Sequence, residues 1–128
     1  MRHDGYVDNQ GDAVIRLDWD QDNDDIWYGD DDLLEYRGEP FTGEIVQMGA
    51  DHMLSQDFFT NGVPNGMNRE WWPDGSLRSE GLVRYGRAYG DHRMWHKNGR
   101  LAEVKHFGDT SSLTSVEEWD EDGNPKRR

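Results

Sequence analysis

Cysteine is absent from the 128 residues, which excludes disulfides, thiolate zinc sites and cysteine nucleophiles. Hydrophobic residues are also few: they make up 33% of the chain, and the mean hydropathy is -1.10. That content is lean for a compact core between two layers. No run approaches the length of a membrane-spanning helix, and the first residues carry no apolar segment of the signal-peptide kind. The chain is therefore expected to be cytoplasmic.

What the chain does contain is a repeat with a step of 24 residues between Phe59 and Gly123. Tryptophans recur in phase, and so do glycines that follow an aspartate or an asparagine. A period in this range is typical of stacked repeat arrays, in which each unit buries its apolar face against its neighbours. The in-phase positions include Trp71, Trp95 and Trp119, then Gly75, Gly99 and Gly123, and also Leu77 and Leu101.

Each unit is predicted to be a β-hairpin with a three-residue loop. Pro73 presets the first loop position, and Gly75 accepts the left-handed backbone that ends the loop. Such a loop pairs Trp72 with Ser76 and Trp71 with Leu77. The same register places residues of opposite charge across from one another, which supports it. The predicted pairs are Glu70 with Arg78, Arg93 with Glu103, Glu118 with Lys126 and Glu117 with Arg127, and Trp95 falls opposite Leu101.

The predicted fold is all-β: an elongated single-layer antiparallel sheet of stacked hairpins, with an acidic N-terminal segment packed on it or leading into it. The first unit has Met48 and Leu54 where the next has Trp71 and Leu77. In the last unit Pro125 takes the leucine position, which suits only a sheet edge. The acidic segment is expected to span residues 1–35 and the array 36–128, with units at about 36–58, 59–82, 83–106 and 107–128.

Negative charge is concentrated at the N-terminal end. Residues 1–35 hold 12 acidic and 2 basic groups, whereas residues 36–128 hold 15 and 12, for a net charge of -13. Such an acidic segment repels nucleic acid and anionic lipid and attracts basic surfaces. One interpretation is a solvated, partly disordered tail. Apolar residues between the acids favour short strands instead, at about residues 14–19, 26–28 and 33–36, with a polar loop at 20–25.

Two units resemble a known repeat. Gly62 and Gly66, followed by the stretch from Glu70 to Leu77 and by Glu80, are similar to the MORN-type repeat in the variant found in bacterial YwqK-like antitoxin proteins. The stretch from Gly86 to Leu101 matches as well. The resemblance covers about residues 33–125 and implies a slightly curved antiparallel sheet and a role as an antitoxin or immunity protein that neutralises a partner toxin. The third unit departs from the pattern where Thr110 and Thr114 replace glycines.

Metal sites are weakly indicated. Alternating aspartates imitate the start of a calcium loop, but its sixth position is Asn23 instead of glycine and its twelfth is Gly29 instead of glutamate. His92 and His96 have the spacing of zinc ligands on a helix, yet on a strand they only share a side. We expect no metal and solvent-facing histidines. The alternating aspartates are Asp18, Asp20, Asp22 and Asp24.

No catalytic signature is present: the chain lacks a nucleophile elbow, a phosphate loop and a deaminase motif. We therefore expect no enzyme activity, no catalytic residues and no cofactor. Trp72, His96 and Asp120 occupy one place in successive units, on the face opposite Trp71 and its equivalents. They either line a partner-binding face or lie under the N-terminal segment, and the sequence leaves open which face is covered.

The leading hypothesis is a non-catalytic binding protein, an antitoxin or immunity protein whose acidic segment occupies the basic surface of a toxin such as a nuclease or nucleotide-directed enzyme. The runner-up is a structural scaffold that self-assembles through sheet edges. Binding to nucleic acid or membrane conflicts with the charge, and the chain is expected to be a monomer or a weak homo-oligomer. The candidate partner-binding residues are Asp18, Asp20, Asp22, Asp24, Asp30, Asp31, Asp32, Trp19, Trp27, Trp72 and His96.

Overall fold

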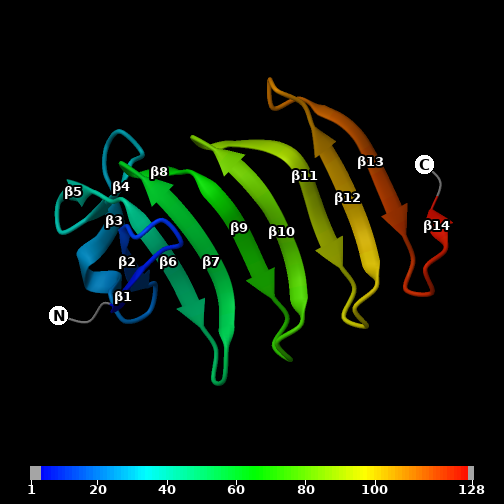
Figure 1. Cartoon of the computed structure of the whole chain (residues 1–128), viewed down its shortest axis with the longest axis horizontal. Coiled ribbons are helices and arrows are strands. Elements are labelled where there is room, and N and C mark those ends of the chain that lie inside the picture. The colour runs from blue at the N-terminus through cyan, green and yellow to red at the C-terminus, as the bar shows by residue number, and fades with distance from the viewer. Residues whose placement is uncertain (1–3, 127–128) are drawn as a thin grey trace.

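Hairpins stand side by side in one long antiparallel sheet, shown in the computed structural model that describes residues 4–126 (Figure 1). The first and last described strands, β1 and β14, lie at opposite ends of this row. Within that range, no helix is long and apolar enough to cross a membrane. In spatial order the sheet contains β1 (Asp4–Val7), β2 (Ala13–Asp18), β6 (Gly43–Met48), β7 (Met53–Thr60), β9 (Gly66–Trp71), β10 (Leu77–Arg84), β11 (Arg87–Trp95), β12 (Leu101–Phe107), β13 (Leu113–Trp119) and β14 (Pro125–Lys126), and β8 (Val63–Pro64) pairs with β7.

The repeated loops have the predicted form. Gly75, Gly99 and Gly123 have φ angles of 93°, 88° and 89°, a left-handed backbone that suits glycine. In the first of these loops, the Trp72 amide donates to the Ser76 carbonyl over 2.8 Å. The predicted pairings of Trp71 with Leu77, Trp95 with Leu101 and Glu118 with Lys126 are confirmed, and Pro125 lies in the edge strand β14.

Two of the predicted charge pairs are wrong. Glu70 lies opposite Ser79 instead of Arg78, and Arg93 lies opposite Val104 instead of Glu103. The cause is one extra residue, Arg78 in β10 and Ala102 in β12, inserted shortly after each loop as a β-bulge. The predicted pair of Glu117 with Arg127 falls outside the described residues.

Two further turns differ from the repeated pattern. In the hairpin of β6 and β7, Met48 pairs with Met53 instead of Leu54, because this turn is one residue shorter. Between β12 and β13, where Thr110 replaces a glycine, the loop lengthens and Ser111 takes the left-handed conformation with φ of 63°. The two preceding units use the pairs Asn61-Gly62 and Tyr85-Gly86 there, with both residues at positive φ.

The described part of the acidic segment, residues 4–35, is folded and is not a disordered tail. Strand β2 pairs with β6 in parallel, the one parallel pairing among the described strands. The connection between them forms a 3-10 helix (Asn23–Asp25) and a small antiparallel sheet of β3 (Ile26–Tyr28), β4 (Leu34–Tyr36) and β5 (Glu39–Pro40). A parallel pair requires such a crossover. We call this three-stranded sheet the cap sheet.

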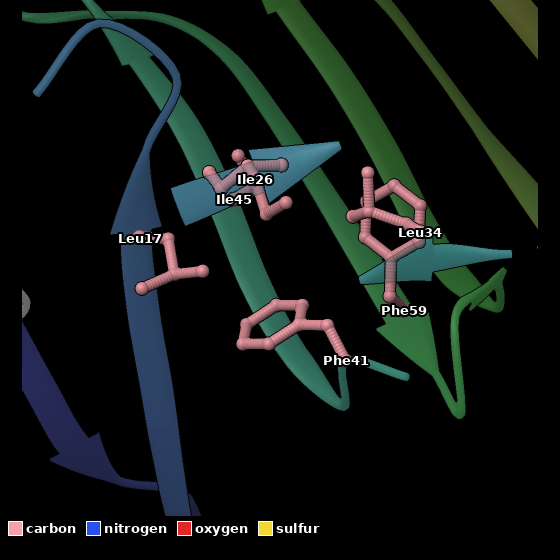
Figure 2. Close-up of a cluster of buried hydrophobic side chains, with 6 residues drawn as sticks. All are labelled: Leu17, Ile26, Leu34, Phe41, Ile45 and Phe59. Atoms are coloured by element: carbon pink, nitrogen blue, oxygen red, sulfur yellow. The ribbon is translucent and has the colours of Figure 1, made fainter. Parts of the chain in front are cut away.

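The hydrophobic core lies between the cap sheet and one end of the large sheet. Figure 2 shows its side chains, which come from strands of both sheets and, for Phe41, from the connection between β5 and β6. Trp19 and Tyr36 pack against this cluster from its border. Most other apolar side chains of the array are half-buried, as expected for a single layer. The six core residues are Leu17, Ile26, Leu34, Phe41, Ile45 and Phe59.

The register decides which face of the large sheet the cap sheet covers. Leu17, Ile45 and Phe59 share one face with Trp72, and that face carries the cap sheet over β2, β6 and β7. Trp71, Trp95 and Trp119 share the opposite face, as predicted from their spacing. We call the two surfaces the cap face and the tryptophan face.

Candidate protein-binding surface

Two acidic loops flank strand β3 of the cap sheet. One precedes the strand and carries Asp20 and Asp24; the other follows it and carries Asp30, Asp31 and Asp32. All five side chains are exposed, and none forms an ion pair with lysine or arginine within residues 4–126. Since β3 is three residues long, its ends are about 10 Å apart. The two loops therefore place uncompensated negative charge at both ends of one short strand.

Two of the predicted partner-binding aspartates hold the loop together instead. Asp22 is only 4% exposed, and its carboxylate accepts the Asp18 amide over 2.8 Å. The Asp18 carboxylate accepts the amides of Asp20 and Gln21. Asp22 is therefore not available to a partner, because the loop backbone uses it. Among the described residues, no group of three or more potential ligands is arranged to hold a metal ion.

The predicted aromatic anchors of this segment separate into two kinds. Trp19 packs against the core and is half-buried, so only part of its ring is open to a partner. Trp27 and its neighbour Tyr28 are 53% and 58% exposed. The Trp27 indole N–H donates to Glu35 over 3.2 Å, so the ring is oriented while much of its surface meets water. Large exposed aromatic rings of this kind are typical of binding surfaces.

Trp72 and His96 lie apart from the acidic loops, at the hairpin tips of later units. They line a hollow of about 400 Å³ together with Met94 and Lys97. The charged groups of Arg78 and Lys97 lie 4.8 and 5.4 Å from the centre of the Trp72 ring. The His96 Nε2 atom is 2.9 Å from the Trp119 carbonyl oxygen. Both predicted residues thus connect neighbouring hairpins, and the structure does not unite them with the acidic segment.

The sequence predicts solvent-facing histidines, but in the structure their rings also contact neighbouring strands. His92 lies over Gly81, where an added Cβ would come within 2.4 Å of its ring. Its Nε2 atom is 2.8 Å from the Leu82 carbonyl oxygen, and its ring packs edge-on against Phe107 with a centroid distance of 5.0 Å. This histidine therefore serves packing between strands.

A polar row crosses the tryptophan face and balances its charge. Buried Glu44 on β6 accepts hydrogen bonds from Arg16 on β2 and from Gln56 on β7. Arg69 on β9 then donates to Gln56 over 3.2 Å and to Glu80 on β10 over 3.3 Å. Each carboxylate of this row has a cationic partner, so the excess negative charge lies elsewhere.

The same row ends in a histidine held between two carboxylates. His106 on β12 contacts Asp91 through Nδ1 at 2.7 Å and Glu117 through Nε2 at 3.3 Å. The hydrogen bond to Asp91 raises the pKa of His106 above its usual value, and Glu117 adds to the effect. Below that pKa the cation ties β11, β12 and β13 together.

Glu35 and Gly29 belong to the candidate surface and were not predicted as site residues. Tyr28 is exposed at the end of β3, but it pairs with Leu34 and so lies on the other face of the cap sheet. In the sequence, Glu35 is simply one of the 12 acidic groups of residues 1–35. The signal that could have found it is the turn around residues 29–33: closing a hairpin there places Trp27 opposite Glu35, as the structure has it.

No protein-family model, no curated protein and no solved structure matches this chain. The candidate surface therefore has to be judged from its own geometry and charge.

Proposed function

We propose that the chain is a non-catalytic antitoxin or immunity protein of the cytoplasm, related to MORN-type repeat proteins, whose acidic loops occupy the basic cleft of a partner toxin. The observation that carries the proposal is the charge of the cap sheet. Five exposed carboxylates without basic partners among residues 4–126 flank an exposed tryptophan, while the polar row of the array is balanced.

The physical mechanism is occlusion. A toxin that acts on nucleic acid or nucleotides needs a positive cleft to hold phosphate groups, and a rigid carboxylate surface can occupy the same positions. Opposite charges speed the encounter, and burial of an aromatic side chain slows dissociation. Because the cap sheet is anchored by the core, its carboxylates are presented without a large ordering cost.

The direct test uses the protein encoded beside this one as the toxin candidate. Co-expression of the full chain should restore growth that this candidate inhibits. Changing Asp30, Asp31 and Asp32 to asparagine should weaken binding at least about tenfold and flatten its dependence on salt, because three charges are removed from the interface. Binding is measured by titration calorimetry at several salt concentrations.

A matched control removes the same charge at a distance from the cap sheet. Asp51, Asp109 and Asp122 lie exposed in hairpin loops, and their change to asparagine should leave affinity within about twofold. Equal losses in the two triple variants, or unchanged affinity in both, would contradict occlusion by the acidic loops.

A second candidate function is a self-assembling scaffold. It is favoured by the partly open edge of β13, where described strand β14 pairs only with Glu118 and Trp119. Sedimentation of the purified chain separates the two proposals: a concentration-dependent series of oligomers supports the scaffold, and a monomer at all concentrations supports the antitoxin.

A further inference from the structure

The outer face of the cap sheet has no covering element among the described residues. The register places Trp27, Glu35 and Pro40 side by side on it, one from each strand, because Trp27 pairs with Glu35 and Glu35 with Pro40. Their neighbours Ile26 and Leu34 point the other way into the core. This face presents an exposed indole beside a carboxylate, with acidic loops at both ends of β3.

Two carboxylates converge beside that indole. Glu35 uses Oε1 to accept the Trp27 N–H, and its Oε2 is 2.6 Å from where a Cβ on Gly29 would be. The Oδ1 atom of Asp31 is 3.1 Å from the same point. Glycine at position 29 therefore leaves the room in which the two carboxylates approach each other. Neither forms an ion pair with a lysine or arginine of the described chain.

Elsewhere the chain itself shows what this combination of groups binds. The Arg37 guanidinium lies 5.1 Å from the centre of the Tyr36 ring and 3.4 Å from the Asp25 carboxylate. The Arg16 guanidinium lies 5.0 Å from the centre of the Tyr6 ring and pairs with Glu44. In both cases an arginine is held by an aromatic ring and a carboxylate together.

We propose that the outer face of the cap sheet binds an arginine side chain in an extended segment of a basic partner protein, with the guanidinium stacked on Trp27 and hydrogen-bonded to Glu35 and Asp31. This assignment rests on the proposed antitoxin function and names the group through which the partner is recognised. Trp27 and Glu35 on this face thus have the roles that Tyr36 and Asp25 have within the chain.

Arginine fits this face better than lysine for a geometric reason. A guanidinium is planar and weakly hydrated, so it stacks on an indole while its N–H groups reach carboxylates at its edge. An ammonium is compact and strongly hydrated, and its attraction is nearly independent of direction. The acidic loops attract either cation at a distance, whereas the ring and the converging carboxylates favour arginine.

The test uses the intact chain and two blocked peptides of equal charge, Gly-Arg-Gly-Arg-Gly and Gly-Lys-Gly-Lys-Gly. The indole N–H resonance of Trp27, assigned with the variant Trp27→Phe, is followed by NMR at low ionic strength. The arginine peptide should shift this resonance saturably and bind at least about fivefold more tightly than the lysine peptide. Trp27→Ala lacks this resonance, so its affinity for the two peptides is measured by titration calorimetry beside the parent. It should show no preference for arginine, and because the side chain points away from the core this variant should remain folded.

Glu35→Gln and Asp32→Asn form a matched pair, since each removes one charge but only Glu35 belongs to the converging carboxylates. The first should weaken the arginine peptide at least about fivefold and the second less than about twofold. Equal affinities for the two peptides, equal losses in the two variants, or no saturable shift of Trp27 would each overturn the proposal. Concentration-dependent self-association through this face would do the same, because the occupant would then be a second copy.

The arginine-binding proposal and the proposed function can be contradicted separately. If arginine recognition holds while the triple change at Asp30, Asp31 and Asp32 leaves toxin neutralisation intact, the occlusion mechanism is wrong and the binding site stands. If neutralisation depends on the acidic loops but Trp27 shows no preference for arginine, only the present proposal is wrong.

Discussion

At the scale of single residues, two acidic side chains on opposite faces of the sheet show how burial and hydrogen-bond partners decide whether a carboxylate charge favours or opposes folding. Glu44 is fully buried and accepts hydrogen bonds from Arg16 and Gln56, so its charge is compensated. Asp57 on the cap face has Asn68 as its side-chain partner. Burial raises the pKa of Asp57 above its usual value, and the nearby Glu70 raises it further. The charge of Asp57 therefore opposes folding at neutral pH.

Replacing Asp57 with asparagine should therefore stabilise the protein at pH 7, by up to about 1 kcal/mol after allowance for the part of the side chain that water reaches. A raised folded-state pKa means that protonated Asp57 favours folding below its unfolded value, near 3.8, and that this contribution is lost as pH rises through the folded value. The difference in the free energy of unfolding should thus shrink below pH 4. Urea unfolding at several pH values measures it.

Asp51→Asn is the control for net charge, because Asp51 is exposed in the turn between β6 and β7. It should change the free energy of unfolding by less than about 0.5 kcal/mol at every pH. If the Asp57→Asn variant were less stable than the parent at pH 7, the interactions of the carboxylate would stabilise the fold by more than its burial destabilises it.

At the scale of elements, hairpin loops were predictable from the sequence and strand bulges were not. Proline, aspartate and glycine at fixed places define the loop, and so the pairing of Trp71 with Leu77 follows from local chemistry. The bulge at Arg78 leaves no such mark: Glu70 satisfies its carboxylate with Ser79 as readily as with a cation. Charge pairing over exposed strands was therefore too weak a criterion to decide the register.

Some features of the candidate surface could also be predicted from the sequence, and others could not. Its negative charge follows from composition, and the strand at 26–28 from its apolar residues. The burial of Asp22 and the meeting of Glu35 with Trp27 depend on how the crossover between β2 and β6 packs. Pairing between distant segments has no local signature, because it is decided by the core that both segments build.

At Gly99 the role of the left-handed loop glycine can be tested without disturbing any contact. No atom lies within 4 Å of a Cβ added at Gly99, whose φ is 88°, so Gly99→Ala should destabilise through the backbone alone, by about 1–2 kcal/mol. Asparagine at the same position should cost less, since it tolerates this conformation. Thermal unfolding followed by tryptophan fluorescence measures both.

Gly108 provides the comparison. Its φ is not positive, and a Cβ there would make an ordinary contact of 3.5 Å with Thr114. Gly108→Ala should leave the melting temperature within about 2 °C of the parent. Equal effects at the two glycines would mean that chain flexibility in the unfolded state, not the left-handed loop, decides the outcome.

At the scale of the whole molecule, stability is unevenly distributed. The described core lies between the cap sheet and β2, β6 and β7, whereas the later hairpins are held mainly by their immediate neighbours. The uncompensated charge lies at the same end as the core. The most firmly packed part of the protein therefore also carries the candidate binding surface.

Truncation should reveal this asymmetry. A chain ending at Phe107 loses β13 and β14 but keeps the core, and it should still unfold cooperatively, with the free energy of unfolding lowered by about 1–3 kcal/mol. A chain beginning at Gly43 loses β1 to β5 and exposes Ile45 and Phe59, so it should lose cooperative unfolding. Urea unfolding monitored by near-ultraviolet circular dichroism distinguishes the two. Similar stability in both fragments would contradict a core confined to one end.

The parallel pairing of β2 with β6 has a consequence for the order in which the protein acquires its shape. Arg16 and its partner Glu44 are 28 residues apart, whereas each later hairpin closes over a short loop. Contacts between distant positions form more slowly than contacts between near ones, because a longer stretch must lose its freedom first. During synthesis the acidic stretch leaves the ribosome before its partner strand exists. We therefore expect the acidic stretch to stay unstructured until the β6–β7 hairpin emerges. Its candidate binding surface should form only then.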